Sequence, residues 1–165
     1  AVAQDGAFQA AAPGFPPQMT EPLPTAAAPA AVTTYTGSVS VKISGTITPA
    51  ITASTKIVCS IQIITYSHGT IVGGQKVYFA AYDNASATAS VSGTTYTCTV
   101  PLKYKWTDLM TGNQPGVFAN VYMFDAARPS PISGVHQRSA QNVFVGYMTP
   151  STSGATRSFT TTIGL

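Results

Sequence analysis

The chain has 165 residues, which fits a single domain with a sizeable buried core. Only 8% of the residues are charged, whereas an average soluble domain has roughly 25%. The net charge of +3 comes from basic residues spread along the chain, which argues against the clustered basic footprint of a nucleic-acid-binding protein. Abundant Thr, Ser, Val and Ile favour strands over helices, and the low charge favours self-association.

Residues 1–33 are predicted to form an extended N-terminal arm. Six of the twelve prolines lie between Pro13 and Pro29, and alanine fills much of the remainder. Proline fixes φ and removes a backbone donor, so no long strand or helix can pass through this segment. We expect a polyproline-like arm that lies on a surface, its own or a neighbouring subunit's, and the proline-free stretch 4–12 could add a strand to a neighbour's sheet. Four apolar side chains are predicted anchors at a subunit interface: Phe8, Phe15, Met19 and Leu23.

Residues 34–165 are predicted to form one all-β domain. Apolar and polar side chains alternate over residues 38–48 and 96–106, and a period of two places them on opposite faces of a strand. Six further segments have strand-like composition: 55–66, 76–82, 86–92, 117–125, 142–148 and 157–165. We therefore predict a two-sheet antiparallel sandwich of about eight strands, immunoglobulin-like or jelly-roll-like, with a barrel as the alternative.

Glycine, proline and polar residues mark the expected irregularities. Gly45 falls on the apolar side of its strand, which indicates close packing or a bulge. Pro101 cannot donate to a ladder, so it requires an edge or a bulge, and we expect its strand to bend or change sheets there. Asp83 and Asn84 are typical of a turn. Three longer segments are predicted to be connections: 67–75, 107–116 and 126–140.

The two cysteines, Cys59 and Cys98, both lie on apolar strand phases. We predict a disulfide between them and an oxidising compartment, the alternative being two buried thiols in a cytosolic protein. The sequence leaves open whether the bond lies within one sheet or between two. No apolar run approaches the ~20 residues that span a bilayer. We expect no membrane span and, since the chain begins at Ala1, a processed, secreted form at the cell surface.

The titratable residues do not suggest an enzyme. Asp108 and Asp125 are the acids best placed to form a carboxylate pair, and we expect both to be solvated or to cap turns. His68 and His136 lie in predicted loops, and two histidines are too few for a zinc site, which needs three or four ligands. No phosphate-binding or nucleophile motif occurs. We predict no catalytic residue, no metal and no cofactor.

The leading functional hypothesis is a structural subunit of an extracellular homopolymer, a pilus-like or other surface filament assembled by arm or strand exchange. Lys103 and Lys105 follow Pro101 on a predicted edge and are predicted to lie where a neighbour's arm docks. The first alternative is a secreted adhesin or carbohydrate-binding module, which would bind a surface glycan through the three long connections. The second is a virion-shell or surface-layer protein. A hydrolase or metalloprotein is the least favoured hypothesis.

Overall fold

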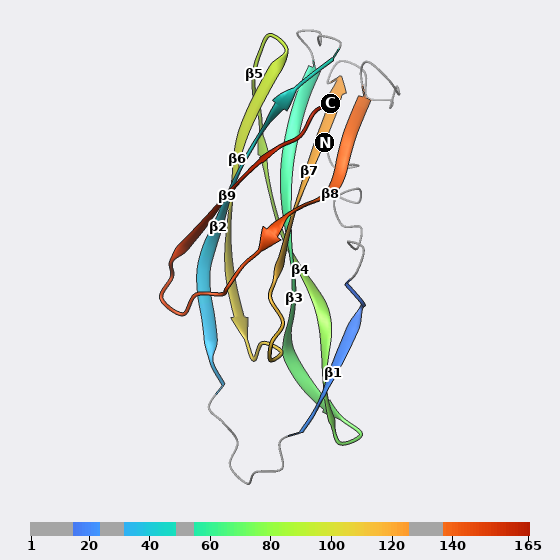
Figure 1. The fold of residues 1–165 in the computed structure, drawn as a ribbon, viewed down its shortest axis with the longest axis vertical. Helices are drawn as coiled ribbons and strands as arrows, with labels where there is room; N and C mark the ends of the chain where they lie inside the picture. Colours follow the sequence, from blue (N-terminus) through green and yellow to red (C-terminus); the bar gives the residue numbers. More distant parts are fainter. Residues whose placement is uncertain (1–14, 24–31, 49–54, 126–136) are drawn as a thin grey trace.

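The computed structural model describes residues 15–23, 32–48, 55–125 and 137–165, which form nine β-strands (Figure 1). These are β1 (Gln18–Pro22), β2 (Thr34–Thr46), β3 (Thr55–Val72), β4 (Gln75–Thr88), β5 (Ser90–Ser92), β6 (Thr95–Thr107), β7 (Gly116–Asp125), β8 (Gln137–Tyr147) and β9 (Thr156–Thr162). Sheet A has the order β1-β4-β3-β7-β8, and sheet B has the order β5-β6-β2-β9. The predicted two-sheet sandwich is confirmed. Its strand pairs are antiparallel except for β2 and β9.

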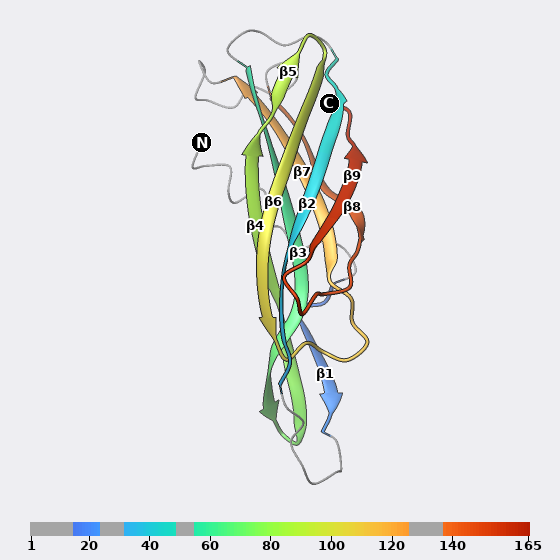
Figure 2. The same ribbon diagram turned by 90° about the vertical axis from the view of Figure 1, so that its left-hand side faces the viewer.

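The apolar core lies between the two sheets, which Figure 2 shows as two layers with sheet B in front. Its members are the side chains that alternate inward along β2, β3, β6 and β7. Fully buried examples are Val39, Val41, Ile43, Ile57, Ile61, Ile63, Val100, Val117, Val121 and Met123. The period-two pattern therefore identifies the core-facing positions of these strands, and β3 and β7 are interior strands of sheet A.

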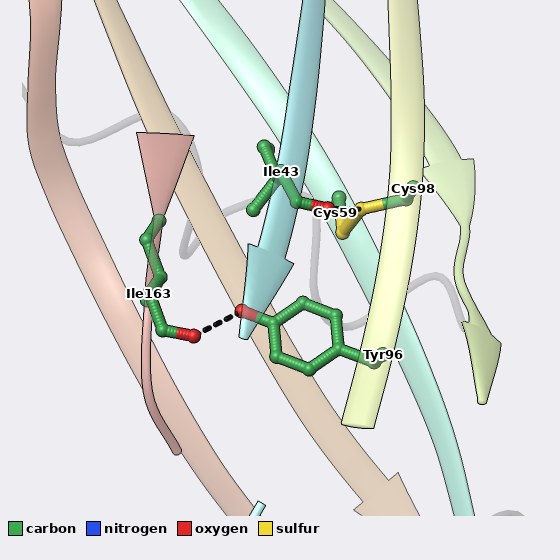
Figure 3. Close-up of a disulfide and its surroundings, with 5 residues drawn as sticks. All are labelled: Ile43, Cys59, Tyr96, Cys98 and Ile163. Atoms are coloured by element: carbon green, nitrogen blue, oxygen red, sulfur yellow. Dashed lines mark hydrogen bonds between the residues drawn. A yellow bond between two sulfur atoms is a disulfide. The ribbon is translucent and has the colours of Figure 1, made fainter. Parts of the chain in front are cut away.

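The predicted disulfide is present and joins the two sheets. Cys59 belongs to β3 and Cys98 to β6, and their Cα atoms are 6.5 Å apart (Figure 3). The bond is buried among the core residues, because both cysteines sit on inward-facing positions. Sheets A and B are thus linked covalently in the middle of the core, and the question that the sequence left open is answered.

Tyr96 and Gly45 form a second tie, within sheet B. The Tyr96 hydroxyl donates a hydrogen bond of 2.6 Å to the carbonyl oxygen of Ile163, just after β9 (Figure 3). Gly45 on β2 is the register partner of Tyr96. A Cβ at Gly45 would overlap the Ile163 carbonyl oxygen and lie 2.8 Å from the Tyr96 ring. The close packing predicted at Gly45 is confirmed, because this phenol passes over it to reach the far strand.

Pro101 lies in an edge position, as predicted, but its strand neither bends nor changes sheets. The register between β2 and β6 is unbroken from Thr34–Thr107 to Thr46–Thr95. The Ile47 N–H donates to the Thr94 carbonyl at 2.7 Å, so the alternation of the antiparallel ladder makes Ser40–Pro101 a non-hydrogen-bonded pair. The missing donor of Pro101 therefore faces the opposite edge of β6, where β5 covers only residues 95–97.

Three boundary predictions are wrong. Residues 67–75 are not a loop, because β3 and β4 form a long hairpin whose turn is Gly73 and Gly74, both with positive φ. Asp83 and Asn84 are not a turn, since they lie inside β4, where the Asp83 carboxylate accepts a 2.7 Å hydrogen bond from the Trp106 indole. Strand β8 begins at Gln137, inside the predicted connection 126–140.

Removing the disulfide should destabilise the sandwich strongly. The Cys59→Ala/Cys98→Ala variant opens a loop with a sequence separation of 39 residues. Without the crosslink the unfolded chain gains conformational entropy, which lowers the free energy of unfolding by about 4 kcal/mol. Urea denaturation of the variant, and of the reduced wild-type protein as a control for side-chain volume, measures the loss. A loss below about 1 kcal/mol in both would contradict the structural role assigned to this bond.

Stability should fall at alkaline pH partly through Tyr96. Burial raises the pKa of its phenol from 10.0 to about 12. Because the folded-state pKa lies above the unfolded one, the neutral phenol stabilises the fold below pH 10, and this contribution disappears as the pH rises through 12. In Tyr96→Phe the free energy of unfolding should be about 1 kcal/mol lower at neutral pH and less steeply dependent on pH above 10. Parallel pH profiles for the two proteins would argue against this assignment.

Candidate functional site

The candidate site is the place where part of the predicted arm docks on sheet A. Strand β1 is the outermost strand of this sheet and pairs antiparallel with the first residues of β4, from Gln18–Phe79 to Pro22–Gln75. The proline-poor window between Pro17 and Pro22 is long enough for a short strand. The arm thus extends a sheet of its own chain, and the stretch 4–12, where strand addition was predicted, lies outside the described residues.

The prolines around β1 are placed where a ladder tolerates them. The Ala80 N–H donates to the Pro17 carbonyl at 2.9 Å. Since hydrogen-bonded pairs alternate in an antiparallel ladder, Met19 and Glu21 face β4 with their backbone groups, and Thr20 faces away. Pro22 falls on the outward-facing phase and removes no ladder bond, and Pro17 contributes only its carbonyl. A proline-rich segment can therefore still add a strand here.

Phe15 anchors the arm through a second apolar cluster on the outer face of sheet A. Its ring packs edge-on against Phe118 with centroids 5.5 Å apart, and Ile64 and Ala80 complete the cluster. A Cβ at Gly116 would lie 2.7 Å from the Phe15 ring, so the glycine leaves room for it. Ile64 and Phe118 are buried although they point away from the main core.

Tyrosine hydroxyls and a carboxylate fasten both ends of the docked segment. The Tyr66 hydroxyl donates to the Pro16 carbonyl. The Tyr78 hydroxyl donates to Glu21 Oε1 at 2.9 Å, and the Thr111 N–H lies 3.4 Å from Glu21 Oε2. Burial and the hydrogen bond to Glu21 raise the pKa of Tyr78. Glu21 therefore connects β1 both to β4 and to the segment between β6 and β7.

An ion pair supports Tyr78 beside the Glu21 contact. Lys76 Nζ lies 2.5 Å from Asp108 Oδ1 and 5.4 Å from the centre of the Tyr78 ring. The hydrogen bond to Asp108 is the main reason why the pKa of Lys76 is raised. Asp108 also has a φ of 55°, an unusual backbone conformation for a residue other than glycine. The hypothetical pairing of Asp108 with Asp125 is thus replaced by a lysine contact, and the Asp125 side chain lies outside the described residues.

A small open pocket adjoins the arm. It has a volume of about 140 Å³ and is lined by Phe15, Pro16, Met19, Tyr66, Asn113 and Tyr147. Small-molecule sites usually measure roughly 300–1,000 Å³. This pocket is therefore smaller than a typical small-molecule site.

The structure separates the predicted interface residues into two groups. Phe15 and Met19 lie in the arm-docking site, and Leu23 follows β1 half-buried. Phe8 lies outside the described residues. Lys103 and Lys105 are exposed on sheet B, so the structure does not bring them together with the arm residues of the same chain. Their contact with a neighbour's arm stays a prediction.

Sequence reasoning missed the residues that receive the arm. The sequence patterns single out none of these residues, which are Tyr66, Tyr78, Phe118 and Glu21. One signal was available: β7 is apolar on both phases, so Phe118 needed a cover on the outer face of its sheet. The register that brings Glu21 beside Tyr78 has no local signature.

Within the described ranges, no group of three or more His, Cys, Asp or Glu could hold a metal ion. His68, which has a φ of 55°, places its Nδ1 2.7 Å from the Thr107 hydroxyl, and His136 lies outside those ranges.

No helix in the described part of the chain is long and apolar enough to cross a membrane. No protein-family model matches the chain, and no significant match was found among curated proteins or solved structures.

A matched pair of proline variants tests the docking ladder. Met19→Pro removes an N–H that faces β4, whereas Thr20→Pro removes one that faces away. Met19→Pro should release β1, so that hydrogen exchange at Glu21 and protease cleavage near it increase at least about fivefold, since one lost bond costs roughly 1 kcal/mol or more. Thr20→Pro should stay close to wild type. Equal effects of the two variants would contradict the assigned ladder.

Proposed function

We propose that the protein is a structural subunit of an extracellular homopolymer, a pilus-like or other surface filament, in which β1 of each subunit pairs with β4 of the next. The observation that carries this proposal is the docked arm itself. Phe15, the β1 ladder and Glu21 together form a compact set of contacts between the arm and sheet A. Strand addition of this kind is a recurrent mode of recognition between chains.

The same contacts can form within one chain or between two. Exchanging an identical element between copies replaces each internal contact by an equivalent external one, so the exchange itself costs little. The connection from Leu23 to Val32 contains the eight residues 24–31, which reach at most about 29 Å when extended. When each subunit donates its arm to one neighbour and accepts an arm from a different one, the contact is head-to-tail and generates an open filament if the rotation does not close.

Exposed apolar side chains lie at the end of the sandwich from which the arm departs. β1 and the β3–β4 hairpin lie at the same end of the molecule (Figure 1). Ile71 and Val72 near the hairpin turn are 64% and 59% exposed, and Phe79, the register partner of Gln18, is 57% exposed. Burying such a group against another subunit would be favourable. The low overall charge would oppose this contact only weakly.

The disulfide supports the extracellular part of the proposal. A buried Cys59–Cys98 bond is compatible with a secreted protein, because such bonds persist in oxidising compartments. A virion shell or a surface layer would use the same exchange with a different symmetry, and electron micrographs of the native assembly separate these three cases.

An adhesin or carbohydrate-binding module is the second candidate, and an aromatic row favours it. Phe144 stacks near Phe118 and Tyr147, with ring centroids 5.5 and 4.9 Å apart. Phe144 and Tyr147 are 49% and 54% exposed, and Asn113 and Tyr147 both line the small pocket. Exposed aromatic rings with a neighbouring amide could stack on sugars. A monomer in size-exclusion chromatography that binds a glycan array would favour this candidate.

Deletion of residues 1–32 should abolish assembly and leave a folded core. The core keeps its disulfide and the apolar residues between the sheets, whereas it loses Phe15, β1 and Glu21. Negative-stain microscopy and sedimentation should show only small, soluble particles. A synthetic peptide of residues 15–23, but not a scrambled one, should bind the truncated protein. Normal polymers formed by the truncated protein would contradict the proposal.

A further inference from the structure

The outer face of sheet B is covered with hydroxyl groups. The register of its strands turns every second residue outward, and Figure 2 looks onto this face. The outward hydroxyl residues are Ser90, Ser92, Thr95, Thr97, Thr99, Thr107, Thr34, Thr36, Ser38, Ser40, Ser44, Thr46, Thr156, Ser158, Thr160 and Thr162. None of them is fully buried, and hydroxyls of adjacent strands can meet, as Ser38 and Thr156 do at 2.8 Å. We call this surface the hydroxyl face.

The hydroxyl face is also positively charged. Lys42, Lys103 and Lys105 project from it and are exposed. The acids whose side chains the structure describes lie elsewhere: Glu21 and Asp108 in the arm-docking site and Asp83 against Trp106. Lys42 is the register partner of Thr99 on β6. At ~3.4 Å per residue, Lys103 and Lys105 therefore lie about 7 Å apart along the strand direction, and Lys42 lies about 14 Å from Lys103 in the same direction. The three lysines form a row, and none of the acids whose side chains are described provides a countercharge to it.

The composition of the hydroxyl face favours a hydrated, anionic partner. Its outward positions hold Ser, Thr, Lys and Pro101, with no aromatic residue and no arginine. Single-stranded nucleic acids are held by aromatic stacking, and membrane surfaces by inserted apolar groups, neither of which this face provides. Protein interfaces are enriched in Tyr, Trp and Arg and depleted of Lys and Ser. A sugar polymer presents hydroxyl groups with which these serines and threonines can exchange hydrogen bonds, and the lysines add a preference for anionic groups.

We propose that the hydroxyl face binds an acidic polysaccharide that lies along the strands of sheet B. The three lysines contact its anionic groups, and the serine and threonine hydroxyls exchange hydrogen bonds with its sugar hydroxyls. The surface is exposed, so each charge contact is weak and sensitive to salt. This binding does not depend on strand exchange. Repetition of the face in a polymer would raise the apparent affinity through multivalency.

Binding of the full-length protein to immobilised polygalacturonate, with neutral dextran as the reference polymer, tests the proposal. Lys42→Gln/Lys103→Gln/Lys105→Gln should weaken binding to polygalacturonate by roughly 100-fold, which corresponds to the usual contribution of three lysines at an anionic surface. Lys103→Glu should weaken it at least about tenfold. The matched control Lys56→Glu makes the same change in net charge on sheet A and should change binding less than about twofold.

Binding should be lost when the salt concentration rises from ~0.02 to ~0.5 M, because the Debye length then falls several-fold. The proposal is overturned if wild-type protein does not bind polygalacturonate at low salt, if dextran binds equally well, or if Lys56→Glu and Lys103→Glu weaken binding equally. Tighter binding to poly(dT), to poly-glutamate or to anionic lipid vesicles would also overturn it, in favour of a nucleic acid, an acidic peptide or a membrane. Each variant should unfold at the same temperature as the wild-type protein, which shows that a change in binding does not come from loss of the fold.

Discussion

The Cys59–Cys98 bond is the constraint on which the rest of the structure depends. It joins an interior strand of sheet A to an interior strand of sheet B at the centre of the apolar core. The two sheets carry few charged residues and side chains of modest size, and the disulfide holds them together at this point. The sandwich therefore does not need the arm to complete its core. The contacts of Phe15, β1 and Glu21 lie on the outer face and at the edge of sheet A, outside this core. The arm can therefore serve assembly, because the fold is stabilised elsewhere.

The two faces of the molecule differ in chemistry in a way that suits a surface polymer. Sheet A presents an edge and an apolar cluster that receive a proline-flanked strand, and these contacts are directional, since a ladder fixes their register. The outward positions of sheet B carry mainly hydroxyls and lysines. Beyond Thr97, where β5 no longer pairs with it, β6 has an open edge that carries Pro101, Lys103 and Lys105, residue types that discourage further strand pairing. Strand exchange at β4 would thus leave the hydroxyl face free.

Side-chain alternation carries most of the information that the sequence holds about this fold. It predicted the inward positions of β2 and β6, the pairing of the cysteines and the close packing at Gly45. It failed where polar residues continue a strand, as at Asp83, because the satisfying partner, Trp106, lies on the other sheet. It also failed for β1, since prolines mask a strand that is only five residues long. The Glu21–Tyr78 contact depends on a long-range register that no local pattern encodes.

Disulfide trapping between two subunits tests the central claim of strand exchange most directly. Gln18 and Phe79 face each other in a non-hydrogen-bonded pair, the geometry in which cysteines can bridge adjacent strands. A Gln18→Cys chain and a Phe79→Cys chain are mixed, assembled and oxidised, and the products are separated without reducing agent. The account predicts disulfide-linked dimers that contain one chain of each kind, and a ladder of multimers for the double variant. A double variant that forms only an internal bond, together with no mixed dimer, would contradict it.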